Sequence, residues 1–435
     1  MKVAIDTYGC TRNKSDEELI KGQIEKDEKL EETKDIDEAD TVILNTCGVK
    51  NKTQSKMINR LKRYRKKGKK VLVTGCLPRI NTEILEEHEA AMTDPNTIEK
   101  IPEALEKIKK GKKPVYTSEK RGNKLEEKKK IRKGITGILP IAEGCLGNCS
   151  YCGVKKARGN LYSYPENSII EEIKRLIQKG KKQIYLTSQD TGCYGLDKKD
   201  TNLPKLIRKI TEIDEEFKLR IGMMNPEHLK KQERRKELIK SMKNPKIYKF
   251  IHLPIQSGSN KVLKDMNRKY TVEEFKKIAG DLEKDIKELN LATDIIVGYP
   301  TEKEKHFQET IKLIKEIKPD VTNISRFHPR PNTEAEKLEP HNSQVLKKRS
   351  KKLSQITQKI SKNKNKQYID KEKEVMITEL TKNKITARTN NYKKVRIQEN
   401  KEKDKNQLKE LEKGNKIKVN VISVGSRGLK GEIVK

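Results

Sequence analysis

Three cysteines, Cys145, Cys149 and Cys152, form a Cys-x3-Cys-x2-Cys motif in residues 144–153 of this chain. Three thiolates at this spacing can ligate three irons of a cubic [4Fe-4S] cluster and leave the fourth iron without a protein ligand. The small residues between the cysteines suit a loop that must wrap closely around an inorganic cube. An amino group and a carboxylate of a small molecule can fill an open iron. The motif therefore predicts an iron–sulfur site with room for a chelating ligand.

A structural zinc site and a disulfide are the alternative uses of this motif. Structural zinc takes four ligands, usually as paired Cys-x2-Cys knuckles, and no nearby Cys or His supplies a fourth. A disulfide leaves one of the three thiols over and needs an oxidising compartment. The seven cysteines and the absence of a hydrophobic segment behind Met1 favour a reducing cytoplasm. No apolar run approaches the ~20 residues that span a bilayer, so we expect a cytoplasmic protein without membrane contact.

Three further cysteines each follow a short apolar segment within residues 1–112. The segments are 3–5, 41–44 and 71–73, and the cysteines are Cys10, Cys47 and Cys76. Charged, helix-prone stretches separate the segments, as is typical of an open parallel sheet with crossover helices. Such sheets place their ligands at the carboxyl ends of the strands. The pattern favours a second three-thiolate cluster, with ordinary burial of each cysteine as the alternative.

The central part of the chain, from residue 134 to about 335, contains six apolar segments with amphipathic helices between most of them. The segments are 138–141, 184–186, 219–222, 250–253, 294–297 and 321–324. Six strand–helix units predict a (β/α)6 partial barrel. The first segment leads directly into the Cys145 motif, which places the cluster at the carboxyl mouth, where such barrels keep their sites.

Polar residues follow each of these six segments. Gln189 and Asp190 come after the second, and Gln256 comes after the fourth. Any one such residue is more often a turn or a helix cap. Their recurrence at every strand end indicates a polar ligand with amino, carboxylate and ribose groups, and we expect Gln189, Asp190 and Gln256 to orient it.

The remaining segments are a charged stretch, a basic helix and a β-rich end. Residues 113–133 lose periodicity and predict a linker, or alternatively a solvated helix. Residues 341–366 predict a basic helical bridge. Five short strand-like segments follow, and with their polar turns they suit a small barrel of the oligonucleotide-binding (OB) type. They are 375–378, 385–388, 394–397, 417–424 and 431–434.

The charge of the chain is strongly positive. Lys and Arg number 100 against 64 Asp and Glu, an excess of 36 in 435 residues. Such a field favours polyanions, nucleic acid first, although lysines scattered through every segment also fit compositional drift. Residues 361–435 carry 21 Lys and Arg against 10 Asp and Glu, an excess of 11 in 75 residues. Because this density is nearly double the average, RNA binding is the better explanation for the C-terminal segment.

The Cys145 motif, with Tyr151 before its last cysteine, resembles the signature of the radical S-adenosylmethionine (SAM) enzymes. The whole chain is similar to the methylthiotransferase family of these enzymes, and most similar to its archaeal and eukaryotic branch. The motifs that carry this likeness are 145–152, 157–159, 163–165, 187–192, 225–226, 253–259 and 326–331. Three features depart from the branch: Gln189 in place of the usual Glu, Thr301-Glu302-Lys303 in place of Gly-Glu-Thr, and Cys193, which stands in place of a small residue and which we expect to be a packed or free thiol.

The resemblance implies an α/β fold of three domains. They are an N-terminal open parallel α/β cluster domain (1–112), a radical SAM core with the partial TIM barrel (134–360) and a small OB-like RNA-binding barrel called TRAM (367–435). It implies two [4Fe-4S] clusters as cofactors, one on Cys145, Cys149 and Cys152 that reductively cleaves SAM to a radical. The other, on Cys10, Cys47 and Cys76, would carry the sulfur. No catalytic residue is predicted beyond these ligands.

The implied activity is addition of a methylthio group to C2 of N6-threonylcarbamoyladenosine at position 37 of tRNA, 3′ of the anticodon. C2 is an unactivated C–H position, which ordinary side chains cannot attack, so a cofactor must carry the chemistry. Partners would be tRNA and an electron donor of ferredoxin or flavodoxin type. Sister enzymes act on isopentenyladenosine in tRNA or on an aspartate of a ribosomal protein. A non-catalytic RNA-binding protein with structural metal is the alternative from another class.

Overall fold

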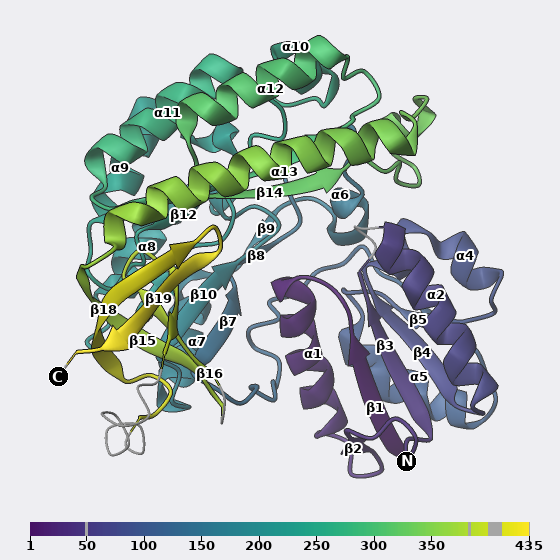
Figure 1. The fold of residues 1–435 in the computed structure, drawn as a ribbon. Helices are drawn as coiled ribbons and strands as arrows, with labels where there is room; N and C mark the ends of the chain where they lie inside the picture. Colours follow the sequence, from purple (N-terminus) through teal and green to yellow (C-terminus); the bar gives the residue numbers. More distant parts are fainter. Residues whose placement is uncertain (48–50, 382–383, 399–410, 435) are drawn as a thin grey trace.

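The structure is a computed structural model that describes residues 1–47, 51–381, 384–398 and 411–434 (Figure 1). Parts of the predicted C-terminal domain (382–383, 399–410 and 435) lie outside the described residues. The N-terminal domain lies to one side of the partial barrel, and the C-terminal barrel lies below the long helix α13. Within the described ranges, none of the helices combines the length and apolar character that crossing a bilayer requires.

The N-terminal domain is an all-parallel sheet with strand order β2-β1-β3-β4-β5-β6. The strands are β1 (Lys2–Thr7), β2 (Glu31–Thr33), β3 (Thr41–Thr46), β4 (Lys70–Gly75), β5 (Ala91–Thr93) and β6 (Val115–Tyr116). The helices are α1 (Thr11–Ile24), α2 (Asn51–Lys66), α3 (Leu77–Ile80), α4 (Thr82–Glu86) and α5 (Ile101–Lys109), with the 3-10 turn η1 (Ile98–Lys100). Apolar residues of α1 and α5 pack on one face and those of α2 on the other. The open parallel sheet is confirmed.

The strands of this sheet are added on both sides of β1, so the order of addition reverses between β1 and β3. From β1 the chain passes outward to β2, and it then returns to add β3 on the other side of β1. Doubly wound sheets bind their ligands at such a switch point, beyond the carboxyl ends of the two strands. Cys10 and Cys47 follow β1 and β3, so the topology places both at this point.

The six predicted strands of the central domain are confirmed as a partial barrel. They are β7 (Thr136–Pro140), β10 (Gln183–Thr187), β11 (Lys218–Arg220), β12 (Phe250–His252), β13 (Asn290–Val297) and β14 (Val321–Arg326). They form two parallel three-stranded sheets, β7-β10-β11 and β12-β13-β14. Single parallel bridges, Leu219 with Ile247 and Met223 with His252, connect the two sheets. Strands β7 and β14 are the edges, which leaves the barrel open between them.

Helices cover the outside of this barrel and bury one continuous apolar core. They are α6 (Val154–Arg158), α7 (Glu166–Gln178), α8 (Leu203–Thr211), α9 (Gln232–Met242), α10 (Asn260–Asp265), α11 (Val272–Asp285), α12 (Glu304–Ile317) and α13 (Ser343–Asn365). The 3-10 turns are η2 (Thr191–Cys193), η3 (Pro226–Leu229), η4 (Glu334–Lys337) and η5 (Lys366–Tyr368). A short hairpin of β8 (Ala142–Glu143) and β9 (Tyr162–Ser163) frames the Cys145 motif. The predicted basic bridge is α13, which runs along β14 (Figure 1).

The C-terminal strands close into a barrel in the order β15-β16-β17-β19-β18. They are β15 (Glu372–Thr381), β16 (Lys384–Thr389), β17 (Lys394–Ile397), β18 (Lys416–Gly425) and β19 (Gly428–Ile433). Only the β17–β19 pair is parallel. Alternate residues of each strand fill its small core. The predicted OB-like barrel is confirmed.

Residues 113–133 do not form the solvated helix that was the alternative to a linker in the sequence analysis. The segment starts with β6 and continues as an irregular strap across the gap between the first two domains. Lys124 and Lys129 are nearly inaccessible within it, and they bind Glu143 and Glu172 at 2.7 Å and 3.2 Å. The high charge of this segment therefore serves buried ion pairs as well as the surface.

Candidate active site

The Cys145 motif forms a loop that follows β8 and is fixed at both ends. Gly144 precedes it with φ +72°, and a Cβ there would lie 1.9 Å from the Asn160 carbonyl oxygen, so only glycine fits. The Cys145 amide donates to the Gly159 carbonyl at 3.1 Å. The loop is thus anchored before it reaches its first thiol.

Residues just after α10 hold the other side of the loop. The Asn267 side-chain amide donates to the Asn148 carbonyl at 2.7 Å. The Arg268 guanidinium donates through Nη1 to Cys149 Sγ at 3.1 Å and through Nη2 to Asn225 Oδ1 at 2.6 Å. A cation beside this sulfur favours its thiolate form, which is the form that binds metal. Sequence reasoning missed Arg268, because an Arg among the many basic residues of this chain carries no distinguishing signal.

The other two thiols of the motif lie in a less polar setting. Burial and the nearby Asp190 carboxylate raise the pKa of Cys145 to about 12, and burial raises the pKa of Cys152 to about 11. Metal ligation deprotonates a coordinating thiol outright. Loading a cluster on this loop must therefore release protons.

A cavity of about 170 Å³ opens directly beside the three thiols. The three polar residues predicted to orient a ligand, Gln189, Asp190 and Gln256, all line it together with Asn225 and Arg268. Gln189 Oε1 is buried and has no hydrogen-bond partner in the described part of the chain. An orphaned acceptor is costly unless a ligand donates to it, so this oxygen fits the amino group of a bound molecule. Gln256 has φ +75°, which is rare for a residue with a side chain.

Asp190 uses both of its carboxylate oxygens within the protein. Oδ1 accepts from the amides of Gly192 and Asn225 at 2.9 Å and 3.0 Å, and Oδ2 lies 2.9 Å from His228 Nε2. Asp190 therefore holds together the loops that carry Gln189 and Asn225. The expectation that it also orients the ligand stays a prediction.

Cys193 is a fully buried thiol that donates to the Asp190 carbonyl at 3.0 Å. With Asp190 and His228 it forms the one group, among the described residues, of three metal-ligand types whose ligand atoms lie within 4.8 Å of one another. This proximity is explained by the hydrogen bonds around Asp190. Cys193 fits the expected packed thiol.

The sheet register brings Cys10, Cys47 and Cys76 to one edge of the N-terminal domain. Thr46 pairs with Gly75, so Cys47 and Cys76 are the next residues on neighbouring strands, and the Cys76 amide donates to the Thr46 carbonyl at 2.9 Å. Cys10 follows β1 and caps α1. Asn13, in the first turn of α1, donates to the Thr46 carbonyl at 3.0 Å. Hydrogen bonds to the Thr46 carbonyl therefore connect the segments that carry all three cysteines.

The donor sets fit iron–sulfur clusters better than single ions. Around one tetrahedral zinc, Zn–S bonds of about 2.3 Å would hold the sulfurs within roughly 4 Å of one another. Across the described residues, neither cysteine triplet is that compact. Each triplet supplies three thiols: one lies at the carboxyl ends of the parallel strands β1, β3 and β4, and the other follows β7 and the short strand β8. Both arrangements suit a cube that spreads its ligands and leaves one iron for another molecule.

Two family models match the chain. The Radical SAM superfamily matches residues 139–314, and the Uncharacterized protein family UPF0004 matches residues 2–93. The first spans the partial barrel with the Cys145 motif, and the second spans the sheet with Cys10, Cys47 and Cys76.

Full-length relatives extend the match to nearly the whole chain. A "Probable threonylcarbamoyladenosine tRNA methylthiotransferase" of Pyrococcus horikoshii is 43% identical over 403 residues, 92% of this chain and 94% of the relative. One of the same name from Methanocaldococcus jannaschii is 38% identical and covers 100% of this chain and 97% of its own. The "Threonylcarbamoyladenosine tRNA methylthiotransferase" of Homo sapiens is 36% identical over 87% of this chain and 66% of its own.

Among solved structures, the fold is similar to the radical SAM methyltransferase TsrM of Kitasatospora setae with cobalamin and a [4Fe-4S] cluster bound. The TM-score is 0.57 at 13% identity, over 77% of this chain and 76% of that one. At this identity the likeness concerns the fold alone.

Proposed function

Because the chain belongs to the threonylcarbamoyladenosine tRNA methylthiotransferase family of radical SAM enzymes, we propose that it adds a methylthio group to C2 of N6-threonylcarbamoyladenosine at position 37 of tRNA. Its cofactors are SAM and two [4Fe-4S] clusters. The observation that carries the proposal is the placement of Cys145, Cys149 and Cys152 on one cavity with the orphaned oxygen of Gln189.

Each cofactor is assigned to residues of this chain. Cys145, Cys149 and Cys152 would hold the cluster that binds SAM, and Gln189 would accept from the SAM amino group, with Gln256 beside it. Cys10, Cys47 and Cys76 would hold the second cluster. When bound, these groups supply the one-electron and sulfur chemistry that an unactivated C–H bond requires. The protein would position them and keep Cys149 beside the Arg268 cation.

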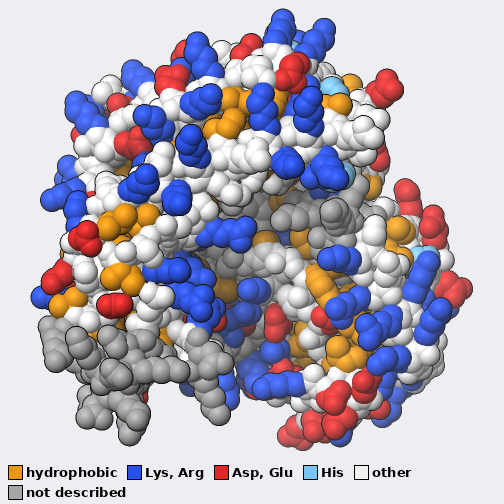
Figure 2. All heavy atoms as spheres, in the orientation of Figure 1, with side chains coloured by type: hydrophobic (Ala, Val, Ile, Leu, Met, Phe, Trp, Pro, Cys, Tyr) orange, Lys and Arg blue, Asp and Glu red, His pale blue; other side chains and the backbone are white. Residues whose placement is uncertain are grey.

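The RNA would lie against the basic surface around the central hollow. Figure 2 shows Lys and Arg side chains around the hollow between the C-terminal barrel side and the N-terminal domain. Phosphate contacts by such side chains position an RNA without reading its sequence. The open side of the partial barrel, between β7 and β14, leaves room for a base to enter. We further propose a cytoplasmic location, no membrane partner and an electron donor of ferredoxin or flavodoxin type.

The test uses the full chain with both clusters reconstituted. It is incubated with SAM, a sulfur source and reductant, and separately with tRNA carrying threonylcarbamoyladenosine, tRNA carrying isopentenyladenosine, and a ribosomal protein. Mass spectrometry of nucleosides and peptides should find the methylthio group only on the first substrate. A product on either of the others would reassign the chain to a sister activity. Iron-free protein that still binds tRNA and never cleaves SAM would support the non-catalytic alternative.

A further inference from the structure

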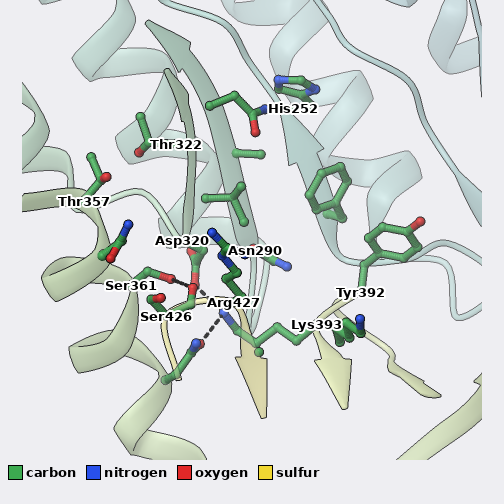
Figure 3. A pocket seen from close by; sticks show the side chains of 18 of the residues that line it. His252, Asn290, Asp320, Thr322, Thr357, Ser361, Tyr392, Lys393, Ser426 and Arg427 are labelled. Atoms are coloured by element: carbon green, nitrogen blue, oxygen red, sulfur yellow. Dashed lines mark hydrogen bonds and ion pairs between the residues drawn. The ribbon is translucent and has the colours of Figure 1, made fainter. Parts of the chain in front are cut away.

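A second cavity of about 590 Å³ lies where the partial barrel, α13 and the C-terminal barrel meet. Figure 3 shows Thr357 and Ser361 of α13 on one side of it, and His252 and Tyr392 on the other. Four consecutive residues of the edge strand β14, from Val321 to Ile324, also line it. The cavity therefore runs along the edge strand β14 of the partial barrel.

Most polar groups that line this cavity already have partners inside the protein. The Lys393 ammonium binds Asp320 at 2.7 Å. His252 Nε2 lies 2.8 Å from Asp294 Oδ1, which also accepts from the Asn323 amide at 2.8 Å. These groups are held in pairs, and a ligand would have to displace a partner to bind them.

Arg220, at the end of β11, is one of the lining residues whose side chain has no such partner. Throughout the described ranges its side chain forms neither a hydrogen bond nor an ion pair; its Nε is buried, and the residue as a whole is half-buried. Its guanidinium is packed instead among three rings, with its central carbon 5.4 Å from the centroid of Tyr185, 4.8 Å from that of Phe250 and 5.1 Å from that of Tyr392. Stacking holds the group in place and leaves its N–H donors unused.

A guanidinium that is held among rings with unused N–H donors is suited to bind an anion. Buried charges in proteins are normally paired, because desolvation of a lone charge is expensive. The guanidinium is a planar fork whose donors match a carboxylate or a phosphate in two parallel hydrogen bonds. The lining of the cavity thus offers a preformed site for one anionic group.

Arg220 lies close along the chain to the proposed SAM pocket. Met223 lines the pocket beside the Cys145 motif, and it follows Arg220 by three residues, a span of at most about 11 Å. Met223 also pairs with His252, which lines the second cavity. A base held at the pocket could extend a side chain of several bonds toward Arg220.

We infer that Arg220 binds the carboxylate of the threonylcarbamoyl group on the substrate base, and that it selects this base over bases with uncharged N6 substituents. The inference rests on the proposed function. A neutral substituent such as isopentenyl would leave Arg220 unpaired and desolvated, and a site that loses its charged partner in this way rejects the wrong ligand. An RNA phosphate is the other anion with the same chemistry.

The test compares anticodon stem–loop RNAs that carry either threonylcarbamoyladenosine or its neutral methyl amide at position 37. Binding and methylthiolation are measured for the wild-type chain, Arg220→Met and Arg220→Lys. The wild type should prefer the carboxylate RNA by on the order of 100-fold, the effect of leaving one partner of a buried pair unpaired. Arg220→Met should bind both RNAs within about threefold of each other. Arg220→Lys keeps the charge without the fork and should retain part of the preference.

Arg388→Met is the matched control, because Arg388 also stacks on Tyr392, at 4.3 Å, but donates to the Tyr392 carbonyl. It should keep the full preference. A preference that survives in Arg220→Met would overturn the inference. Equal weakening of both RNAs in that variant would assign Arg220 to a phosphate and overturn it as well. If the wild type binds with the expected preference but methylthiolates neither RNA, the proposed function fails while the role of Arg220 stands.

Discussion

The hydroxyl groups of Tyr185 and Tyr392 lie 2.5 Å apart, and this contact joins β10 of the partial barrel to the turn between β16 and β17 of the C-terminal barrel. Tyr392 also packs edge-on against the rings of Tyr185 and Tyr248 and at a tilt against Phe250. Its φ of +66° is unfavourable for a residue with a side chain. The tertiary contacts offset that strain, so the C-terminal barrel is fixed to the catalytic domain rather than tethered to it.

The first prediction concerns this junction. Tyr392→Ala removes the aromatic contacts and keeps the left-handed backbone, so it should destabilise the domain junction by about 3 kcal/mol. Tyr392→Phe removes only the hydroxyl contact and should cost about 1 kcal/mol. Hydrogen exchange of residues 384–397 should accelerate strongly in the alanine variant and slightly in the phenylalanine variant. Equal exchange in all three proteins would mean that the junction is held elsewhere.

The second prediction concerns the buried ionic cluster that joins α1 of the N-terminal domain to the Cys145 region. Glu143 binds Arg12, Lys124 and Arg158, and Arg158 binds Asp16 at 2.5 Å. Glu143→Gln leaves three buried cations short of a partner and should destabilise the fold by about 3 kcal/mol. The lowered thermal midpoint of the variant measures the loss. A midpoint within one degree of the wild type would contradict it.

The same cluster predicts a dependence on pH. Burial alone would raise the pKa of Glu143 and of Asp16, but the surrounding cations outweigh it and hold both below their usual values. Carboxyls with a lowered folded pKa contribute stability that is complete above their unfolded pKa, near pH 4, and is lost as the pH falls through the folded values. The wild type should therefore lose stability below about pH 4 more steeply than Glu143→Gln.

How far the sequence predicts this fold depends on how local the signal is. Apolar runs identified each strand of the partial barrel, because burial on both faces leaves a continuous run. They missed the edge strands β2, whose sequence is Glu-Glu-Thr, and β6, because an edge strand needs no apolar run. They also missed the inner strand β5 (Ala91–Thr93), which is only three residues long. The cysteines after β1, β3 and β4 were identified because strand ends and residue type are both local.

Contacts between distant residues could not be predicted in this way. Arg268 reaches Cys149 across 119 positions, and Tyr392 reaches Tyr185 across 207. Nothing near Arg220 in the sequence shows that three rings surround it without an anion. Such pairs follow from the packing of whole domains, so no local stretch of sequence indicates which polar groups are left without a partner.

The third prediction concerns Gln189, whose replacement should raise the stability of the metal-free chain and weaken SAM binding. Replacement by Leu removes the orphaned buried oxygen, so the metal-free chain should become more stable by about 1 kcal/mol. The same change removes the acceptor for the SAM amino group and should weaken SAM binding by up to about tenfold, the value of one hydrogen bond. Thermal unfolding and SAM titration of the reconstituted protein measure the two effects. Stabilisation without weaker binding would remove Gln189 from the SAM site.

The fourth prediction separates the two clusters. Replacing Cys10, Cys47 and Cys76 by Ala should remove about four irons per chain, one cubane, and should abolish methylthiolation. SAM cleavage should persist, because the Cys145 motif lies on another domain. The triple alanine variant of Cys145, Cys149 and Cys152 should instead lose SAM cleavage and keep the N-terminal cluster. Cys193→Ser, a change of a buried thiol outside both motifs, is the matched control and should keep all the iron.

The last prediction concerns the C-terminal barrel as an RNA-binding surface. Arg396 and Lys430 are exposed and directly paired on β17 and β19, and Arg427 is exposed in the β18–β19 turn. Truncation of the barrel would also remove the Tyr392 contacts, so substitution is the cleaner change. Replacing all three cations by Gln should weaken tRNA binding and flatten its salt dependence by roughly 0.7 to 0.9 log units per lost phosphate contact.

Affinity measured across a salt series gives both quantities, and uncoupled SAM cleavage should stay unchanged because both cysteine triplets lie on other domains. The matched control replaces Lys337, Lys113 and Lys100 by Gln. These lysines pair with Glu334, Glu89 and Glu103 on the other domains, so the control removes the same charge from elsewhere on the surface. Equal slopes for the two triple variants would mean that net charge alone attracts the RNA. A flatter slope only in the barrel variant would place phosphates on β17 and β19, and would separate a binding role of this barrel from compositional drift.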